Sequence, residues 1–330
     1  MIEIDRIKKC LEELSSKKIV FVTGKGGVGK SVFCVLLGRF ASRIGKRTVL
    51  VELDGRSAIR DIFSSQIFSK DDPGHSRHVP KIGYTPVELE KDLSATDIDS
   101  EEAAVGYLSE FLGSQKFARM VMNNRIIKYF YEALPAGREI VVLNRLYKLI
   151  TDPENKHDLF VIDMPSSGHA FSTLILPETA VGTFMAGPVV KRAARMAEVF
   201  FDAASTLLVM VSIPEEMSVA ETMEFYPKFR DEIKIPMGPV IINMVSGGYF
   251  DDKMLSLYNT IVGKKDAAKT VLTDNFSRFL RVLDFDISRQ HRTKTHVDSL
   301  AASLGRENVV EMPLCREGPI VFNLEKLVSS

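Results

Sequence analysis

The chain lacks the disulfide and metal cross-links that stabilise small secreted proteins, and it lacks a segment that would anchor it in a membrane. It has three cysteines in 330 residues, Cys10, Cys34 and Cys315, and no CxxC pair. We therefore expect neither a disulfide framework nor a zinc knuckle built from this chain alone. No run approaches the ~18 consecutive apolar residues that span a bilayer. Residues 1–10 alternate apolar and charged side chains, unlike a signal peptide. These absences predict a cytoplasmic location.

The chain also lacks an excess of charge of either sign, because 43 basic residues balance 43 acidic ones. This balance argues against a strongly basic surface, so we expect no nucleic-acid partner. The hydrophobic fraction of 45% is ample for a folded core. A length of 330 residues fits two domains, or one large α/β domain with an insertion.

Six short apolar runs alternate with helical patterns along the chain. They cover residues 19–22, 48–53, 159–162, 207–213, 240–242 and 309–310. Runs that are apolar on both faces and separated by helices are typical of an α/β fold with a central, mostly parallel sheet flanked by helices. From Asp99 to about Thr151 the sequence shows three helical patterns and no convincing strand. We therefore predict a core formed by 1–89 and 152–330, with 90–151 inserted as a helical subdomain.

Residues 24–31 read Gly-Lys-Gly-Gly-Val-Gly-Lys-Ser and match the phosphate-loop pattern GxxxxGK[ST] between a predicted strand and a predicted helix. Glycines let backbone N–H groups surround a phosphate, and the next helix presents its positive end to the anion. Lys30 should bridge the β- and γ-phosphates of ATP, and Ser31 should ligate Mg²⁺. The full expected ATP-binding set is Gly24, Lys25, Gly26, Gly27, Val28, Gly29, Lys30, Ser31 and Val32.

Two further interpretations concern this loop and the third strand. The overlapping GxGxxG at residues 24–29 also permits a dinucleotide site, although that interpretation leaves Lys30 and Ser31 unexplained. Asp163 directly follows the run 159–162, which is the Walker B arrangement of a carboxylate that holds Mg²⁺ directly or through water. We therefore expect a P-loop NTPase.

Lys25 occupies the second position of the loop, which is the deviant Walker A pattern. With it, the sequence resembles the arsenical-pump and tail-anchored-protein-targeting ATPases, a branch of the group that includes MinD and ParA. The resemblance implies that Lys25 reaches across a dimer to the partner's nucleotide, and that Asp54 orients or deprotonates the attacking water. Asp54 can alternatively cap the next helix. Residues 55–57 depart from the family's first switch, which leaves the rate of hydrolysis open.

Three further positions match the family along the chain. The resemblance implies that Glu215 approaches the nucleotide from the dimer side, that the Asn243 amide pairs with adenine, and that Pro313 belongs to an adenine-covering loop. Each also has a plain alternative as a solvated acid, a turn amide or a turn proline. Gly168 and His169 match the family's second switch, which follows Asp163.

The resemblance implies a Mg²⁺-dependent ATPase that converts ATP and water to ADP and phosphate. It implies a homodimer, or a heterodimer with a paralogue, whose opening and closing moves or delivers a bound protein. Residues 90–151 and 171–200 are the expected surface for a hydrophobic-helix client or a membrane component. Methionines would give this surface an adaptable lining: Met120, Met122, Met185 and Met196. Alternatives are a positioning ATPase of the MinD or ParA kind and a nucleotide-binding scaffold with little turnover.

Overall fold

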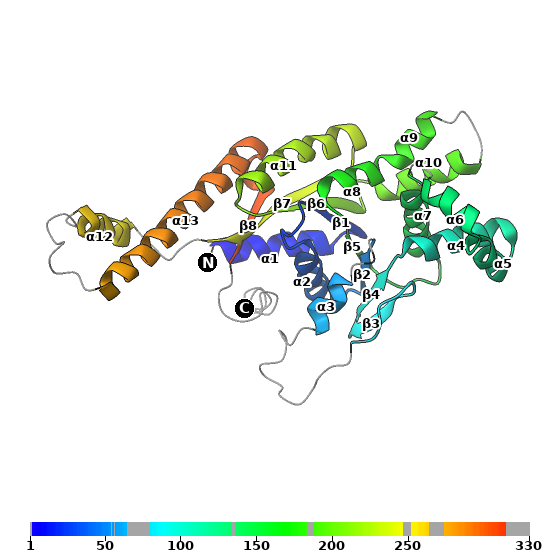
Figure 1. Cartoon of the computed structure of the whole chain (residues 1–330), viewed down its shortest axis with the longest axis horizontal. Coiled ribbons are helices and arrows are strands. Elements are labelled where there is room, and N and C mark those ends of the chain that lie inside the picture. The colour runs from blue at the N-terminus through cyan, green and yellow to red at the C-terminus, as the bar shows by residue number, and fades with distance from the viewer. Residues whose placement is uncertain are drawn as a thin grey trace.

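The computed structural model describes residues 2–53, 55, 57–64, 79–133, 136–183, 188–246, 252–263 and 274–314. Its centre is an eight-stranded sheet in the order β3-β4-β2-β5-β1-β6-β7-β8 (Figure 1). All neighbouring strands are parallel except β3 and β4, which pair antiparallel. The strands are β1 (Ile19–Thr23), β2 (Thr48–Glu52), β3 (Val87–Glu90), β4 (Leu93–Asp97), β5 (Leu159–Asp163), β6 (Thr206–Ser212), β7 (Met237–Val245) and β8 (Val309–Pro313). The predicted α/β fold with a mostly parallel sheet is confirmed.

Helices cover both faces of this sheet. One face carries α1 (Ile2–Ser15), α2 (Lys30–Arg43) and α3 (Ala58–Ser64). The other carries α7 (Gly137–Thr151), α8 (Ser167–Leu174), α10 (Pro188–Phe200), α11 (Glu216–Pro227) with a π-helical turn at Lys228–Ile233, and the end of α13 (Asp274–Leu304). Successive residues of β1 alternate between the two apolar cores, with Phe21 in one and Val22 in the other. This burial on both sides explains why the central strands read as continuous apolar runs.

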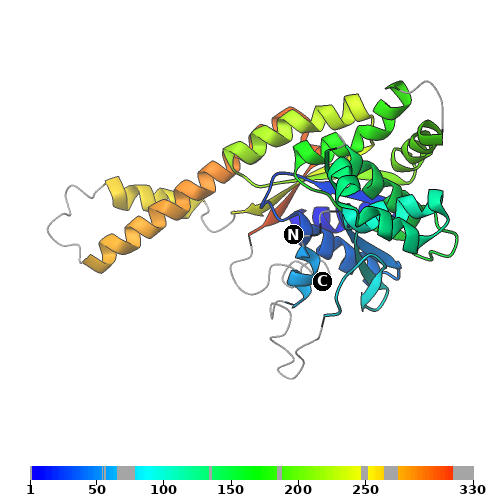
Figure 2. The ribbon, with the colours of Figure 1, turned by 45° about the vertical axis from the view of Figure 1, so that its right-hand side comes forward.

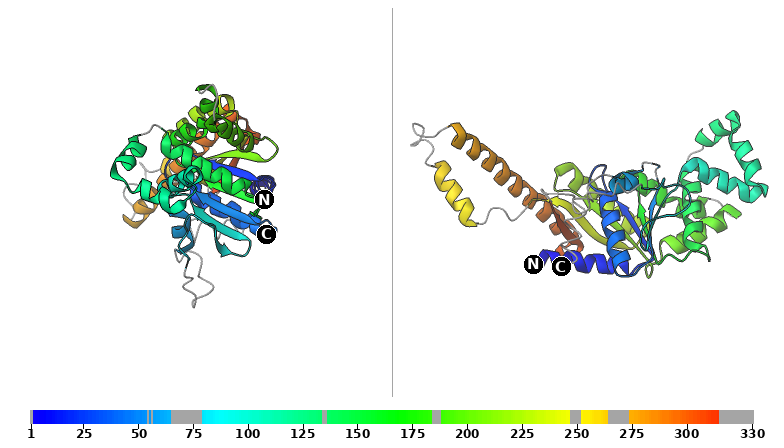
Figure 3. Two further views of the ribbon diagram at one scale, coloured as in Figure 1. Left: turned by 90° about the vertical axis from the view of Figure 1, so that its right-hand side faces the viewer. Right: turned by 90° about the horizontal axis from the view of Figure 1, so that it is seen from below.

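The remaining helices lie at the two ends of the molecule. At one end α4 (Ser100–Leu112), α5 (Gln115–Met122), α6 (Arg125–Ala133) and α9 (Leu176–Thr183) gather around α7 and α10 (Figures 1 and 2). At the other end α12 (Asp252–Gly263) and the first half of α13 extend away from the sheet (Figure 3). Within the residues that the structure describes, no helix is both long enough and apolar enough to cross a bilayer.

The helical segment begins later than residue 90, where the sequence analysis placed the start of the insertion. Leu93–Asp97 forms β4 and pairs along its whole length with β2, so it belongs to the sheet. The helical segment starts at Ser100 and contains four helices, where three helical patterns were predicted. The β4 strand has five residues and a polar side chain at every second position from Ser94, so its apolar signal is too short to recognise alone.

Candidate active site

The loop between β1 and α2 can be built only with glycines at particular positions. Gly24, Gly27 and Gly29 have positive φ values of 146°, 83° and 94°. A Cβ at Gly24 would lie 2.0 Å from the carbonyl oxygen of Val211, and a Cβ at Gly29 would lie 2.4 Å from Nδ2 of Asn243. The loop therefore turns tightly against β6 and β7 and directs its backbone toward the first turn of α2.

The two polar side chains at the start of α2 lie as a nucleotide site requires. Nζ of Lys30 donates to the carbonyl oxygens of Gly24 and Lys25, at 3.1 Å each, so its charge is held over the loop. Oγ of Ser31 donates to Oδ2 of Asp163 at 2.5 Å. A hydroxyl beside a carboxylate supplies the hard oxygen ligands that Mg²⁺ prefers. The residues present thus fit both a phosphate chain and the magnesium ion that accompanies it.

The second switch contains a buried hydroxyl without a hydrogen-bond partner in the described part of the chain. Ser167 is the first residue of α8 and follows Asp163 closely in the chain. It is fully buried, and its hydroxyl has no hydrogen-bond partner among the described residues. A buried hydroxyl without a partner is costly, because it has lost its contact with water.

Two carboxylates outside the predicted ATP-binding set hold the first switch. Glu52, Asp97 and Asp163 stand in register at the carboxyl ends of β2, β4 and β5. Oε1 of Glu52 accepts hydrogen bonds from the backbone N–H groups of Ala58 at 2.8 Å and Ile59 at 3.3 Å.

Asp97 adds a third bond, since its Oδ1 accepts from the backbone N–H of Gly55 at 3.2 Å. The chain that follows the catalytic candidate Asp54 is therefore tied to β2 and β4. Asp54 and Arg56 themselves lie outside the described residues.

Burial makes the Glu52 carboxyl a weaker acid than usual. Removal from water raises the pKa of its carboxyl to about 7, and the hydrogen bond from Ile59 only partly opposes that rise. The nearby carboxylates of Asp97 and Asp163 act in the same direction as burial.

Glu52→Gln should flatten the pH dependence of stability between about pH 4.5 and pH 7. The folded chain binds the Glu52 proton more tightly than the unfolded chain does, so the unfolding free energy falls as pH rises through this window. The expected loss is on the order of 3 kcal/mol. The substituted amide keeps an acceptor for the N–H of Ala58 and does not titrate. Urea unfolding at pH 5, 6 and 7 measures the difference, with Glu12→Gln as an exposed control; parallel curves for Glu52→Gln and the parent would contradict the assignment.

The structure brings Asn243 to the phosphate loop. Its Nδ2 donates to the carbonyl oxygen of Val28 at 3.0 Å, and its Oδ1 accepts from the N–H of Met244 at 2.9 Å. The amide therefore holds the loop, and its contact with adenine stays a prediction. Glu215 is exposed and directly precedes α11, and Pro313 ends β8 beside Val245. Their roles at the nucleotide also stay predictions.

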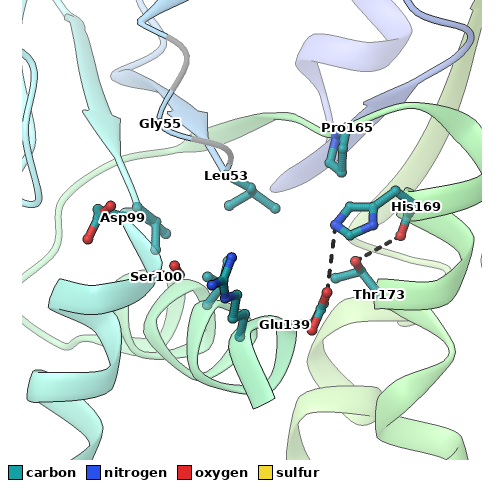
Figure 4. Close-up of a pocket in the computed structure, with 11 residues that line it drawn as sticks. Leu53, Gly55, Asp99, Ser100, Glu139, Pro165, His169 and Thr173 are labelled. Atoms are coloured by element: carbon teal, nitrogen blue, oxygen red, sulfur yellow. Dashed lines mark hydrogen bonds and ion pairs between the residues drawn. The ribbon is translucent and has the colours of Figure 1, made fainter. Parts of the chain in front are cut away.

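A pocket of about 350 Å³ lies between the two switches and the helical segment (Figure 4). Leu53 and Gly55 line it from the first switch, and Pro165 and His169 line it from the second. His169 projects from α8 toward Glu139 of α7, with Nε2 and Oε1 3.7 Å apart. The second switch is thus in direct contact with α7, which in turn packs against α4.

Comparison with known proteins decides the family. The sequence model of the anion-transporting ATPase family matches residues 17–189, just over half of the chain. The chain belongs to this family. The match contains the phosphate loop, both switches and α4–α9, whereas Glu215, Asn243 and Pro313 lie beyond it.

Two curated ATPases show how far the similarity extends. ATPase BagA of Mycobacterium tuberculosis is 24% identical over 239 residues, covering 70% of this chain and 66% of that protein. ATPase asna-1 of Caenorhabditis elegans is 31% identical over 183 residues, covering 52% of this chain and 48% of that protein. The match therefore spans between about half and two thirds of these relatives, and the resemblance to the arsenical-pump and targeting ATPases is confirmed at the level of the family.

Proposed function

We propose that the chain binds ATP with Mg²⁺ and hydrolyses it to ADP and phosphate. The observation that carries this proposal is the hydrogen bond between Ser31 and Asp163. It lies beside a loop in which Gly24 and Gly29 pass too close to β6 and β7 to carry a side chain. The loop N–H groups, the N-terminus of α2 and Lys30 would hold the phosphates. Ser31 and Asp163 would hold Mg²⁺, which neutralises phosphate charge when bound. Asp54 would orient the attacking water, as the family resemblance implies.

Asp54→Asn should preserve ATP binding and reduce turnover at least a hundredfold. The amide occupies the same space but cannot accept a proton from water, and general-base catalysis contributes about 10²–10⁴-fold. Phosphate release and fluorescent-nucleotide titration measure the two properties separately. Asp298→Asn on the exposed surface of α13 is the matched control. Undiminished turnover in Asp54→Asn would reject this role for Asp54.

We also propose that two subunits close face to face on ATP, with Lys25 of each reaching the nucleotide of the other. Lys25 is half-buried in the loop, which leaves part of its side chain accessible to a partner. Addition of Mg²⁺ and ATP should therefore raise the sedimentation coefficient, and Lys25→Ala should abolish that rise. The exposed Lys81 supplies the control, Lys81→Ala. A rise that survives in Lys25→Ala would remove the cross-subunit role.

An apolar surface on α4–α6 supports delivery of a hydrophobic-helix client or docking on a membrane component. It consists of exposed side chains from the end of α4, from α5 and from α6: Phe111, Leu112, Phe117, Met120, Ile126, Ile127 and Tyr129. The predicted methionine lining is wrong at Met122 and Met196, because both are buried in the core, and Met185 lies outside the described residues. Large exposed apolar patches mark interaction sites.

The contact between the second switch and α7 suggests how the bound nucleotide would change the position of this apolar surface. His169 follows Gly168 in the second switch and faces Glu139 on α7 (Figure 4). Helix α7 packs against α4, which carries part of the apolar surface. A movement of α8 on hydrolysis would therefore be transmitted through α7, as coupling through contiguous packed elements requires.

A further inference from the structure

The end of β1 is joined to the beginning of the second switch. Strands β1 and β5 are neighbours, with Val22 opposite Asp163. Their pairing continues past the end of β5, because the backbone N–H of Met164 donates to the carbonyl oxygen of Val22 at 2.9 Å. One residue further along, Oγ1 of Thr23 donates to the carbonyl oxygen of Pro165 at 3.0 Å. We call Met164 and Pro165 the stem of the second switch.

The hydroxyl of Thr23 stands out in an apolar strand. Thr23 is polar and completely buried, whereas the other residues of β1 are apolar. Side chains alternate along a strand, so Thr23 shares with Phe21 the face of the sheet that α8 covers. A valine has nearly the same shape, suits a strand equally well and has no polar group to remove from water. The bond to Pro165 therefore accounts for a hydroxyl at this position.

Thr23 lies between two parts of the proposed nucleotide site. Gly24 follows it directly and begins the phosphate loop. Asp163, which accepts the hydrogen bond from Ser31, precedes Pro165 by two residues. The bond from Thr23 thus connects the loop that would hold the phosphates to the segment that would hold Mg²⁺.

This bond leaves the proposed Mg²⁺ ligands untouched. The hydrogen bond between Ser31 and Asp163 uses oxygen atoms that Mg²⁺ would need, whereas the bond from Thr23 uses a carbonyl of the stem. The ring of Pro165 also fixes its φ, which stiffens the stem. The stem can therefore stay in place when Mg²⁺ binds, and movement of the second switch would begin after Pro165, where α8 starts at Ser167.

We propose that Thr23 is a positioning residue of the ATPase, whose hydroxyl holds the stem of the second switch beside the phosphate loop. It keeps Asp163 next to Ser31 and confines movement to the residues that follow the stem. Thr23 acts through the backbone of Pro165 and takes part in no chemical step. This inference rests on the proposed ATPase function. A displacement of about 1 Å at a reacting group can cost about a hundredfold in rate, so turnover should report the loss of this bond.

Two substitutions separate the hydroxyl of Thr23 from the shape of its side chain. Thr23→Val removes the donor and keeps the shape, and its kcat for phosphate release should fall about tenfold or more. Thr23→Ser keeps the donor and should retain about the parent's kcat. Thr222→Val is the matched control, because Thr222 is also buried but its hydroxyl donates to Ser218 within α11 at 2.8 Å. Its turnover should match the parent's.

The outcomes of this comparison distinguish the inference from the proposed function. An active parent whose kcat is unchanged in Thr23→Val would overturn the inference alone. A parent without turnover would reject the proposed ATPase function, and the inference with it. Thr23→Ala, which also lacks the donor, replaces Thr23→Val in both measurements if the valine variant does not fold.

Hydrogen exchange of the full chain without nucleotide or Mg²⁺ tests the hold on the stem directly. Residues 164–174 should exchange about tenfold faster in Thr23→Val, because the buried carbonyl of Pro165 loses its donor, and at the parent's rate in Thr23→Ser. Strand β6, which pairs with the other edge of β1, should exchange alike in all variants. Parent-like exchange at residues 164–174 in Thr23→Val would overturn the inference. Faster exchange throughout the sheet would also overturn it, because Thr23 would then only support the fold.

Discussion

Alanine in place of Lys30 should remove ATP turnover almost completely, with a loss of ~10²–10³-fold or more. Nζ of Lys30 is held over the carbonyl oxygens of Gly24 and Lys25, where the phosphates would lie. Loss of one preorganised charged donor at a developing negative charge costs about that factor in rate. Lys30→Arg should not rescue turnover, because a planar guanidinium does not replace a compact ammonium at the end of a tight loop. Steady-state phosphate release measures both variants.

The comparison for this variant is Lys81→Ala, which removes an exposed lysine of the same chain outside the loop. Its turnover should match that of the parent. The unfolding midpoint of Lys81→Ala should also match the parent's, and that of Lys30→Ala should fall slightly, because the half-buried Lys30 loses its two hydrogen bonds to the loop. If Lys30→Ala hydrolyses ATP at the parent's rate, the loop is not the phosphate site.

Alanine at Gly24 should lower the free energy of unfolding by about 3 kcal/mol or more and abolish nucleotide binding. The new Cβ would lie 2.0 Å from the backbone oxygen of Val211, and the φ of 146° is strained for any side chain. Because the obstacle is backbone of β6, the loop must move away from the sheet. Urea unfolding and fluorescent-nucleotide titration measure the two effects.

Gly83→Ala provides the matched control, because a Cβ there has no neighbour within 4 Å. Its unfolding free energy should lie within about 0.5 kcal/mol of the parent's. A Gly24→Ala protein as stable as Gly83→Ala would show that the loop does not pack against β6 as described.

The sequence predicted the parallel core because its strands are buried on both faces and stand out as apolar runs. It did not reveal β3 and β4, since the edge strand β3 is only partly buried and its neighbour β4 alternates apolar and polar residues over a short span. It also made no prediction for α12 and α13. Apolar residues of α13 pack on the core near Val297 but face solvent near Val282. The helical spacing of apolar residues alone therefore does not show which part of α13 is buried.

Some residues of the candidate site could be predicted from a short stretch of sequence, and others only from the way the strands pair. The loop and Asp163 were predictable because each is read from a few consecutive residues beside a strand. Glu52 and Asp97 were not, because their joint hold on the first switch depends on the pairing of β2 with β4, which are not consecutive strands. A charged residue inside the run 48–53 was the one available signal. The close packing of Asn243 on the loop likewise depends on the order of strands in the sheet.

Calorimetric titration of Mg²⁺ with ATP into the full chain tests the central claim most directly. The account predicts saturable heat with one nucleotide per chain, loss of that heat in Lys30→Ala, and no heat from a nicotinamide dinucleotide. Binding of the nicotinamide dinucleotide without any binding of Mg²⁺ and ATP would contradict it, because the glycine loop would then serve the dinucleotide site that its GxGxxG spacing also permits.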